Sequence, residues 1–177
     1  GSNPSARAAI AANGSDLADF RLAIALATCN GAAWLDVLLA SLAAQTVPAE
    51  VVVGDDGSTD GTLDLLHAWA PRLPGGLRLL PSVGRRLGAA ANFARILAAC
   101  DRADWVACCD QDDVWDADHL ETLLSAGQTA DAGPVLVASD LRVVDRDLHP
   151  IHPSFWGYQG FDPWRGADLR CLLVMNC

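Results

Sequence analysis

The chain has 177 residues, 51% of them hydrophobic, which supplies enough apolar material for the core of one folded domain. Its formal net charge of −10, with 22 acidic side chains and no lysine, argues against a broad nucleic-acid-binding surface. An anionic ligand would therefore have to be held by a metal ion or by a local group of arginines.

The beginning of the chain is Ala-rich and polar, without a clear period. We expect residues 1–20 to be a flexible segment or a tag remnant that lies outside the fold. An apolar run at 22–27 then predicts a strand, and leucines at helical spacing predict a helix that continues to Gln45. The β-branched residues 51–53 predict a second strand. Together these elements predict a β-α-β unit.

The alternation of strands and helices continues along the chain. Helices are expected at 62–69, 89–99 and 117–125, and strands at 77–80, 104–109 and 135–138. Strands that alternate with helices indicate a mostly parallel central sheet flanked by helices, as in Rossmann-like nucleotide-binding α/β domains. We expect residues 21–177 to form one such domain.

Polar clusters follow several of the predicted strands. They are Thr28 to Asn30 after the first strand, Asp55 and Asp56 after the second, Asp110 to Asp113 after the fourth and Asp140 after the fifth. Because ligands of such sheets bind beyond the carboxyl ends of the strands, neighbouring strands would bring the first three clusters into one cleft. Each cluster alone is also compatible with turn formation, since Asp, Asn, Gly and Ser dominate turns.

The stretch Asp110-Gln111-Asp112-Asp113 places three carboxylates within four residues. Like charges so close repel one another, and a hard divalent cation whose coordination is completed by substrate phosphates would account for them. The alternative is a solvated acidic loop in which Asp113 or Asp116 caps the following helix. The neighbouring polar clusters favour the metal, as a motif-level hypothesis.

Several of these segments occur in an order that is typical of one enzyme family. The chain resembles the family 2 inverting glycosyltransferases with the GT-A fold, and their rhamnosyltransferase-like branch in particular. The matching segments are Ile24–Gly31, Leu42–Thr46, Val53–Thr62 and Asp110–Asp113, with Cys109–Trp115 most similar to the branch and Asn92–Phe93 resembling a recurring family element. The resemblance implies that the domain holds the donor-binding half and the start of the acceptor half of a GT-A fold.

The resemblance implies a metal-dependent enzyme that moves a sugar, with inversion, from a UDP- or dTDP-sugar to a saccharide or lipid-linked acceptor of a cell-surface polysaccharide. dTDP-rhamnose is the first candidate donor. Asp110 and Asp112 would form a DxD motif for Mg²⁺ or Mn²⁺, with Asp112 as the direct ligand and Asp110 near the ribose or a metal-bound water.

The resemblance also implies roles in nucleotide binding. Asp56 would accept a hydrogen bond from N3–H of uracil or thymine, while Asp55 would contact the nucleotide or brace the loop. The candidates for the base pocket and the diphosphate are Thr28, Cys29, Asn30 and Arg86, and those for the sugar or acceptor side are Asp113, Trp115 and Asp140. An exposed surface role for Arg86 is the alternative, because long charged side chains are usually solvated.

Two features depart from the family pattern. The residue before Asn30 is commonly an aromatic that stacks on the base, whereas here it is Cys29. The carboxylate that takes the proton of the acceptor hydroxyl is expected beyond Cys177, so the catalytic base is unknown and the chain is expected to be a fragment. Residues 172–177 look like the approach to the acceptor-side segment. The alternative function is a nucleotide-sugar-binding module without turnover.

No apolar run approaches the ~20 residues of a membrane-spanning helix, and the start of the chain lacks the basic and apolar regions of a signal peptide. The six cysteines show neither a CxxC pair nor the spacing of a disulfide framework, and we interpret them as reduced thiols. We therefore expect a cytoplasmic protein without a membrane span or a nucleic-acid partner, at most peripheral to the inner face of the membrane.

Overall fold

The computed structural model describes residues 20–129 and 133–160, and the chain divides into two compact units, Gly1–Gly133 and Pro134–Cys177. The sequence had predicted one domain from residue 21 onward. Nearly all of the segment 1–20 and the whole of 172–177 lie outside the described residues, so the predictions for them stay predictions. No helix in the part of the chain that the structure describes is long and apolar enough to cross a membrane.

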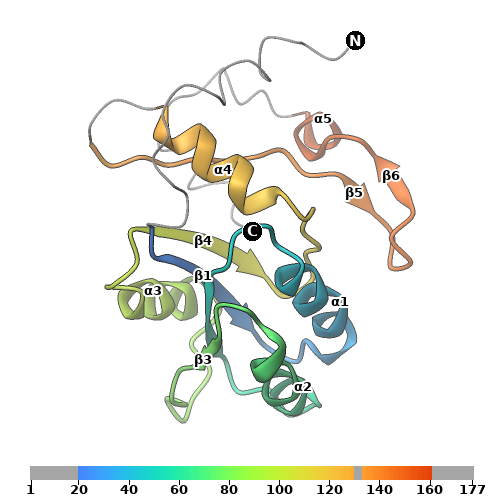
Figure 1. Ribbon diagram of the computed structural model, residues 1–177. Coiled ribbons are helices and arrows are strands. Elements are labelled where there is room, and N and C mark those ends of the chain that lie inside the picture. The colour runs from blue at the N-terminus through green and yellow to red at the C-terminus, as the bar shows by residue number, and fades with distance from the viewer. Residues whose placement is uncertain (1–19, 130–132, 161–177) are drawn as a thin grey trace. The chain divides into compact units, whose positions relative to one another are not determined.

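The first unit is built on a four-stranded parallel sheet with the strand order β3-β2-β1-β4 (Figure 1). Its strands are β1 (Leu22–Thr28), β2 (Glu50–Asp55), β3 (Leu77–Leu79) and β4 (Trp105–Asp110). Its helices are α1 (Ala32–Ala43), α2 (Thr62–Trp69), the 3₁₀ helix η2 (Ala70–Arg72), α3 (Ala89–Ala99) and α4 (His119–Gln128). The predicted parallel sheet flanked by helices is confirmed, and the bounds of α2 and α3 agree with the prediction.

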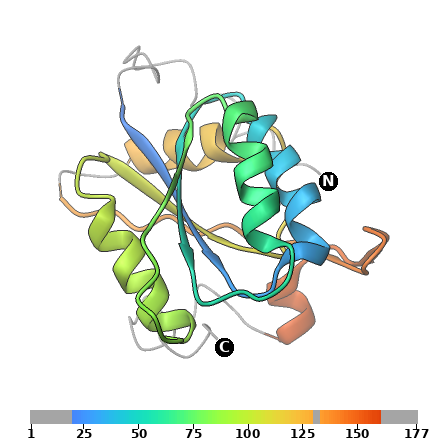
Figure 2. The ribbon, with the colours of Figure 1, turned by 90° about the horizontal axis from the view of Figure 1, so that it is seen from below.

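Helices α1 and α2 lie on one side of the sheet, and α3 lies on the other (Figure 2). The main core forms on the α1 side, where Ile24 and Leu26 of β1 meet a stripe of buried leucines on α1. The stripe has the three- and four-residue spacing of one helix face and consists of Leu35, Leu38, Leu39 and Leu42. Burying a leucine contributes about 1.5–3 kcal/mol, so this stripe is what holds α1 on the sheet.

The face of the sheet that α3 covers is lined by small residues. Ala23 and Ala25 of β1 pack there with Ile96 of α3. Asn92, which is 1% exposed, donates a hydrogen bond of 2.6 Å from Nδ2 to the carbonyl oxygen of Gly54 in β2. The helix can approach so closely because Gly54 has no side chain, and the hydrogen bond satisfies an amide that is otherwise costly to bury.

The second unit is described over residues 134–160. It contains β5 (Val143–Val144) and β6 (Pro150–His152), which pair antiparallel, followed by α5 (Phe155–Gln159). The predicted strand at 135–138 is wrong, because the structure assigns no regular element there. This apolar run has no pairing strand among the described residues, and Leu136 is 74% exposed. A strand needs a partner, whatever its composition.

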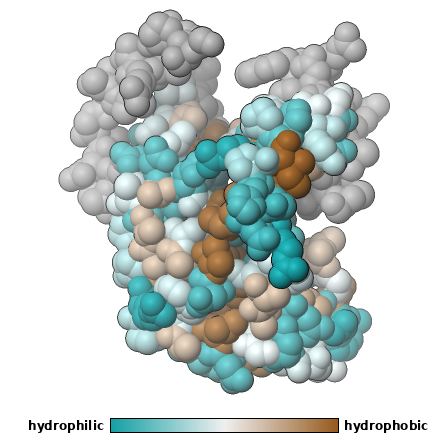
Figure 3. Space-filling view, turned by 90° about the vertical axis from the view of Figure 1, so that its right-hand side faces the viewer, coloured by the Kyte–Doolittle hydropathy of each residue, from teal (hydrophilic) through white to brown (hydrophobic). Residues whose placement is uncertain are grey.

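The surface mixes polar and apolar residues. On the face drawn in Figure 3, hydrophobic residues form small patches between hydrophilic ones. Three of the exposed large apolar side chains are Trp34 and Val37 of α1 and Val114, which follows β4. Isolated apolar side chains of this kind are normal on a protein surface.

The contact between α3 and β2 gives a first prediction. In Gly54→Ala, the new Cβ would lie 2.5 Å from Oδ1 of Asn92 and 2.6 Å from Cγ1 of Ile96, so α3 must shift. Overpacking of this kind costs about 1–3 kcal/mol, more than alanine gains over glycine in a strand, and we expect a lower urea midpoint.

Gly61→Ala is the matched control, because its Cβ would meet only Cβ of Ala32 at 3.8 Å. We expect this control to stay within about 1 kcal/mol of the wild type. Equal midpoints for Gly54→Ala and the wild type would show that α3 does not depend on the close approach.

Candidate functional site

The carboxyl ends of β1, β2 and β4 meet at one edge of the sheet, because the three strands are parallel and adjacent. Thr28 is in register with Asp55 on one side, and Ala27 with Asp110 on the other. A cleft of about 180 Å³ opens there, lined by Ala27, Thr28, Cys29, Asp56, Ala89, Phe93, Asp110, Gln111 and Asp112. It is smaller than the ~300–1,000 Å³ of sites for drug-sized ligands, so it would enclose only part of a ligand of that size.

The topology explains the position of this cleft. The chain leaves β1 through α1 to β2 on one side, and it returns through α3 to β4 on the other side of β1. The two connections diverge beyond the carboxyl end of β1, and such a switch point leaves a crevice in open α/β sheets. The predicted meeting of the first three polar clusters thus follows from the strand order.

The carboxylate of Asp55 holds the loop after β2 together. Its Oδ1 accepts hydrogen bonds from Oγ1 of Thr28 at 3.0 Å and from Oγ of Ser58 at 2.5 Å. Its Oδ2 accepts from the backbone N–H groups of Gly57 at 3.1 Å and Ser58 at 2.9 Å. Four donors occupy this side chain, and Asp55 is not among the residues that line the cleft. The geometry favours the bracing role over nucleotide contact.

Asp56 lines the cleft and is 7% exposed. Its two oxygens accept hydrogen bonds from the backbone N–H groups of Leu87 at 2.6 Å and Gly88 at 2.9 Å, at the start of α3. The hydrogen bond from Leu87 lowers the pKa of Asp56 below its usual value, against the opposing effect of burial, and Gly88 and the charge of Arg86 add to the lowering. Asp56 is therefore a fixed anion in the wall of the cleft.

Three further nucleotide candidates differ in their exposure to the cleft. Cys29 lines it, whereas Asn30 and Arg86 do not. Asn30 has a positive φ of 51°, and its Oδ1 accepts a hydrogen bond of 2.8 Å from the backbone N–H of Thr59. Asn30 thus shapes the loop, while Arg86 is exposed and acts on Asp56 through its charge.

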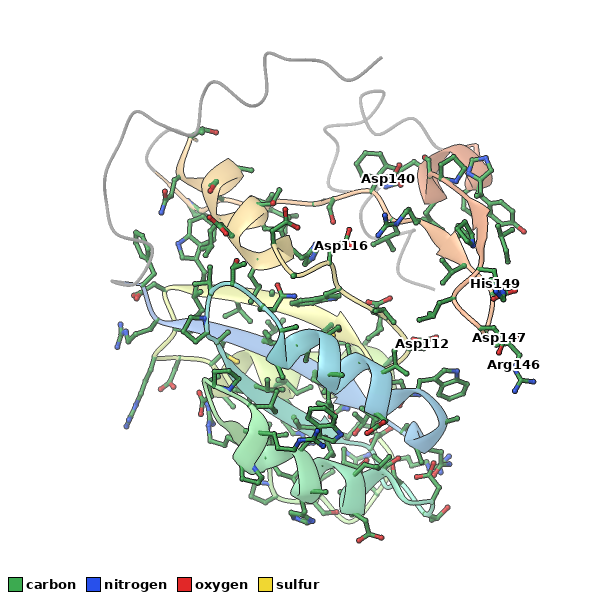
Figure 4. The ribbon with its side chains drawn as sticks, turned by 45° about the vertical axis from the view of Figure 1, so that its right-hand side comes forward. Asp112, Asp116, Asp140, Arg146, Asp147 and His149 are labelled. Atoms are coloured by element: carbon green, nitrogen blue, oxygen red, sulfur yellow. The ribbon has the colours of Figure 1, made fainter. Side chains whose placement is uncertain are left out.

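The acidic stretch after β4 concentrates negative charge. Burial raises the pKa of Asp113 to about 6, and the charges of Asp110 and Asp112 contribute. Burial and then the charge of Asp112 raise the pKa of Asp110, although Asp110 remains exposed to solvent. Asp112 is also exposed and lies beyond the end of β4 (Figure 4). A bound cation would favour the charged carboxylates, which burial and, to a smaller extent, mutual repulsion disfavour.

The residues present fit a divalent cation only in part. No three ligand atoms of the acidic stretch converge within 4.8 Å of one another in the described residues. The stretch therefore suits a cation held by one or two carboxylates, with phosphate oxygens and water completing the coordination, which is how Mg²⁺ is often bound. The alternative, a loop in which Asp113 or Asp116 caps the following helix, stays a prediction, since the N-cap residue of α4 is Asp118, whose side chain makes no capping hydrogen bond.

The part of the chain after the acidic stretch is fastened to α1. The side-chain amide of Gln45 donates to the carbonyl oxygen of Asp116 at 2.8 Å and accepts from the backbone N–H of Leu120 at 3.1 Å. Oγ of Ser41 accepts a hydrogen bond of 3.1 Å from the backbone N–H of Trp115. These contacts fix the segment between the acidic stretch and α4.

The two remaining sugar-side or acceptor-side candidates have packing roles. Trp115 packs against the main core and lies 4.7 Å from the ring of His119, measured between centroids. Asp140 belongs to the second unit, where its Oδ1 accepts hydrogen bonds from the backbone N–H groups of Leu141 and Trp156. Contact of either residue with sugar or acceptor stays a prediction.

One group of three potential ligands does converge in the described residues, on the turn between β5 and β6 (Figure 4). It consists of Asp145, Asp147 and His149. The carboxylate of Asp145, however, accepts hydrogen bonds of 2.9 Å from the backbone N–H groups of both partners and lies 3.3 Å from Nδ1 of His149. Turn formation accounts for this geometry, and no ligand is needed to explain it.

Phe93 and Gln111 line the cleft but were not singled out as site residues by the sequence reasoning. Phe93 of α3 brings an aromatic ring to the cleft, where residue 29 is cysteine. The side chain of Gln111 reaches the residues after β1. The recurring element Asn92–Phe93 and the chemical contrast of Gln111 with its neighbours were the available signals.

Comparison with known proteins agrees with the family resemblance found in the sequence. A family model described as "Glycosyl transferase family 2" matches residues 23–166. The dTDP-rhamnosyl transferase RfbG of Shigella flexneri is 33% identical over 102 residues, covering 56% of this chain and 35% of that protein. An uncharacterised glycosyltransferase of Nostoc sp. is 30% identical over 157 residues, covering 88% of this chain and 46% of that protein.

Among solved structures, the mannosyltransferase PcManGT from Pyrobaculum calidifontis, in complex with GDP-Man and Mn²⁺, is similar with a TM-score of 0.54. It is 26% identical, and the match covers 68% of this chain and 37% of that chain. The present chain spans less than half the length of each of these three proteins.

The raised pKa of Asp113 predicts a pH-dependent stability. The folded state binds the Asp113 proton more tightly than the unfolded state, so this residue costs stability as the pH rises from about 4 through about 6. In a metal-free buffer, Asp113→Asn should therefore be more stable than the wild type at pH 7.5, by on the order of 1–3 kcal/mol, with the gap closing near pH 4.

Urea unfolding at both pH values measures this difference. Asp101→Asn is the control, because it removes the same charge from an exposed position before β4. If Asp113→Asn exceeded the wild type in stability by the same amount at both pH values, the assignment of an unfavourable charge to Asp113 would be wrong. The same holds if Asp101→Asn were stabilised as much as Asp113→Asn.

Proposed function

The chain belongs to glycosyl transferase family 2, and on that premise we propose that it is the donor-binding part of an inverting glycosyltransferase that uses a UDP- or dTDP-sugar and a divalent cation. The observation that carries this proposal is the shared cleft, in which Asp56, Asp110 and Asp112 lie together with the end of β1. The expected GT-A-type α/β fold agrees with the likeness to PcManGT.

The base would bind beside Asp56. A carboxylate offers about four lone-pair positions, and two of those of Asp56 accept hydrogen bonds from Leu87 and Gly88. Acceptor capacity is left for the N3–H group of uracil or thymine. The similarity to a dTDP-rhamnosyl transferase supports a dTDP-sugar, with rhamnose as the first candidate sugar.

Two other lining residues of the cleft would supply apolar contact. Cys29 and Phe93 both line the cleft, and a ring placed beside Phe93 would gain the stacking that an aromatic at position 29 gives elsewhere in the family. Thr28 contributes mainly by holding Asp55, and Asn30 by shaping the loop. The base pocket would thus be formed by α3 as well as by the loop after β1.

The cation would be held by Asp112, with Asp110 as the second carboxylate or as an acceptor for a metal-bound water. Mg²⁺ or Mn²⁺ bound there would offset the negative charge that develops on the diphosphate leaving group. Mn²⁺ is the ion in the PcManGT complex, which supports this choice for testing. Arg86, near Asp56, is the candidate for a direct diphosphate contact.

The acceptor side is less defined. We propose a saccharide or lipid-linked acceptor of a cell-surface polysaccharide, with Asp113, Trp115 and Asp140 as candidates near the sugar or the acceptor. Inverting transfer also requires a base for the acceptor hydroxyl, and we place this base outside the described residues. A nucleotide-sugar-binding module without turnover is the second candidate function, because none of the described cleft residues is assigned to that base.

Binding of nucleotides tests the proposal directly. We expect isothermal titration to show binding of UDP or dTDP that Mn²⁺ tightens. In Asp112→Ala, the increase in nucleotide affinity that Mn²⁺ produces should fall at least about tenfold, as is usual when a metal site loses a ligand or its support.

Asp101→Ala is the matched control, since it removes an exposed carboxylate at the opposite end of β4, and the gain from Mn²⁺ should persist. If Asp112→Ala bound the nucleotide with Mn²⁺ as tightly as the wild type, the metal assignment would be wrong. A sugar-transfer assay with the same donor separates the enzyme from the binding module.

A further inference from the structure

The side chain of Gln111 joins the acidic stretch to the loop after β1. Its Oε1 accepts a hydrogen bond of 2.9 Å from the backbone N–H of Cys29, and its Nε2 donates one of 3.2 Å to the carbonyl oxygen of Cys29. Both hydrogen bonds are partly buried, and Gln111 lines the same cleft as Cys29. A single side chain therefore satisfies the donor and the acceptor of one backbone residue.

These two hydrogen bonds continue the sheet beyond its last backbone pair. The ladder between β1 and β4 ends where Ala27 is in register with Asp110. Beyond this point the strands separate, and the amide of Gln111 takes the place of a neighbouring backbone. Asp110 and Asp112, on either side of Gln111 in the chain, are thereby set at a fixed distance from the loop that carries Cys29.

Gly31 packs directly against the side chain of Gln111. A Cβ at Gly31 would lie 2.9 Å from Cδ of Gln111, closer than real Cβ contacts, so a side chain here would displace that of Gln111. The backbone conformation of Gly31, with φ of −96°, would accept other residues, so the constraint is one of space and not of backbone strain. The glycine and the glutamine are parts of one contact.

The loop after β1 is held on its other side by the loop after β2. The backbone N–H of Asp56 donates to the carbonyl oxygen of Thr28 at 2.8 Å, and the backbone N–H of Asn30 donates to Oγ of Ser58 at 2.8 Å. Gln111 supplies the corresponding link to the acidic stretch. Hydrogen bonds to the short segment Thr28–Asn30 therefore link the proposed base site to the proposed metal site.

We propose that Gln111 is a positioning residue that fixes the spacing between the metal carboxylates and the base pocket, so that one nucleoside diphosphate reaches both. This inference rests on the proposed function. A diphosphate bound to the cation must also place its base beside Asp56, and the gain that the cation gives to nucleotide binding depends on this match. Replacing a residue that only stabilised the fold would change the free energy of unfolding and leave the gain from the cation intact.

The experiment compares the gain in nucleotide affinity from Mn²⁺, which is the ratio of the dissociation constants without and with saturating Mn²⁺. The probe is dTDP or UDP, whichever the wild-type chain binds more tightly. Gln111→Met keeps the length of the side chain and removes both hydrogen bonds. Because both hydrogen bonds are lost, we expect the gain to fall about tenfold, with the affinity for nucleotide alone changed less than threefold.

Gln45→Met is the matched control. Gln45 makes hydrogen bonds to Ser41, Asp116 and Leu120 and lines no part of the cleft, so its loss lowers stability without moving the base pocket. Its gain from Mn²⁺ should stay within twofold of the wild type. Gly31→Ala reaches the same contact from the opposite side and should reproduce the loss seen in Gln111→Met.

The outcomes separate the two levels of inference. If the wild type binds neither nucleotide in the presence of Mn²⁺, the proposed function fails and the role of Gln111 falls with it. If the wild type shows the gain and Gln111→Met keeps it, or if Gln45→Met loses it equally, the positioning role is overturned while the proposed function stands. Should Gln111→Met fail to fold, Gly31→Ala decides between these outcomes.

Discussion

The double pairing of β1 is the constraint on which the first unit depends. This strand is hydrogen-bonded to β2 on one side and to β4 on the other, and its even and odd residues face different helices. Because all three strands run in the same direction, every loop that follows them is delivered to one edge. The cleft is a consequence of this pairing, and its chemistry comes from the residue types that occupy the three loops.

Carboxylates at that edge fall into two electrostatic classes. Asp55 and Asp56 receive hydrogen bonds from several donors, and the pKa of Asp56 is lowered by them. The acidic stretch after β4 has few donors and mutual repulsion, and the pKa values of Asp110 and Asp113 are raised. The protein itself satisfies the first class, whereas the second has unused capacity for a cation. This contrast supports the placing of a cation at the acidic stretch and not at Asp55 or Asp56.

Sequence patterns predicted the fold well where local and tertiary preferences agree. The bounds of α2 and α3 follow from helical spacing, Pro71 and the glycine before Ala89. The segment 135–138 has the composition of a strand but no partner, and pairing is a tertiary property that composition does not contain. The distinction between Asp55 and Asp56 also needed coordinates, since only hydrogen-bond geometry shows which carboxylate is already occupied. The role of Gln111 could not be predicted from its neighbours in the sequence, because its hydrogen-bond partner, Cys29, lies 82 residues away in the chain.

The shared use of Asp56 has a consequence for how this protein can vary. Asp56 lines the cleft and also anchors the start of α3 through its hydrogen bonds with Leu87 and Gly88. Replacement by asparagine would alter this anchorage and the proposed base contact together, so a loss of activity there could not be read as the loss of one contact. Under the proposed function, divergence toward a different base would have to begin at neighbours such as Phe93, which line the cleft without accepting these hydrogen bonds.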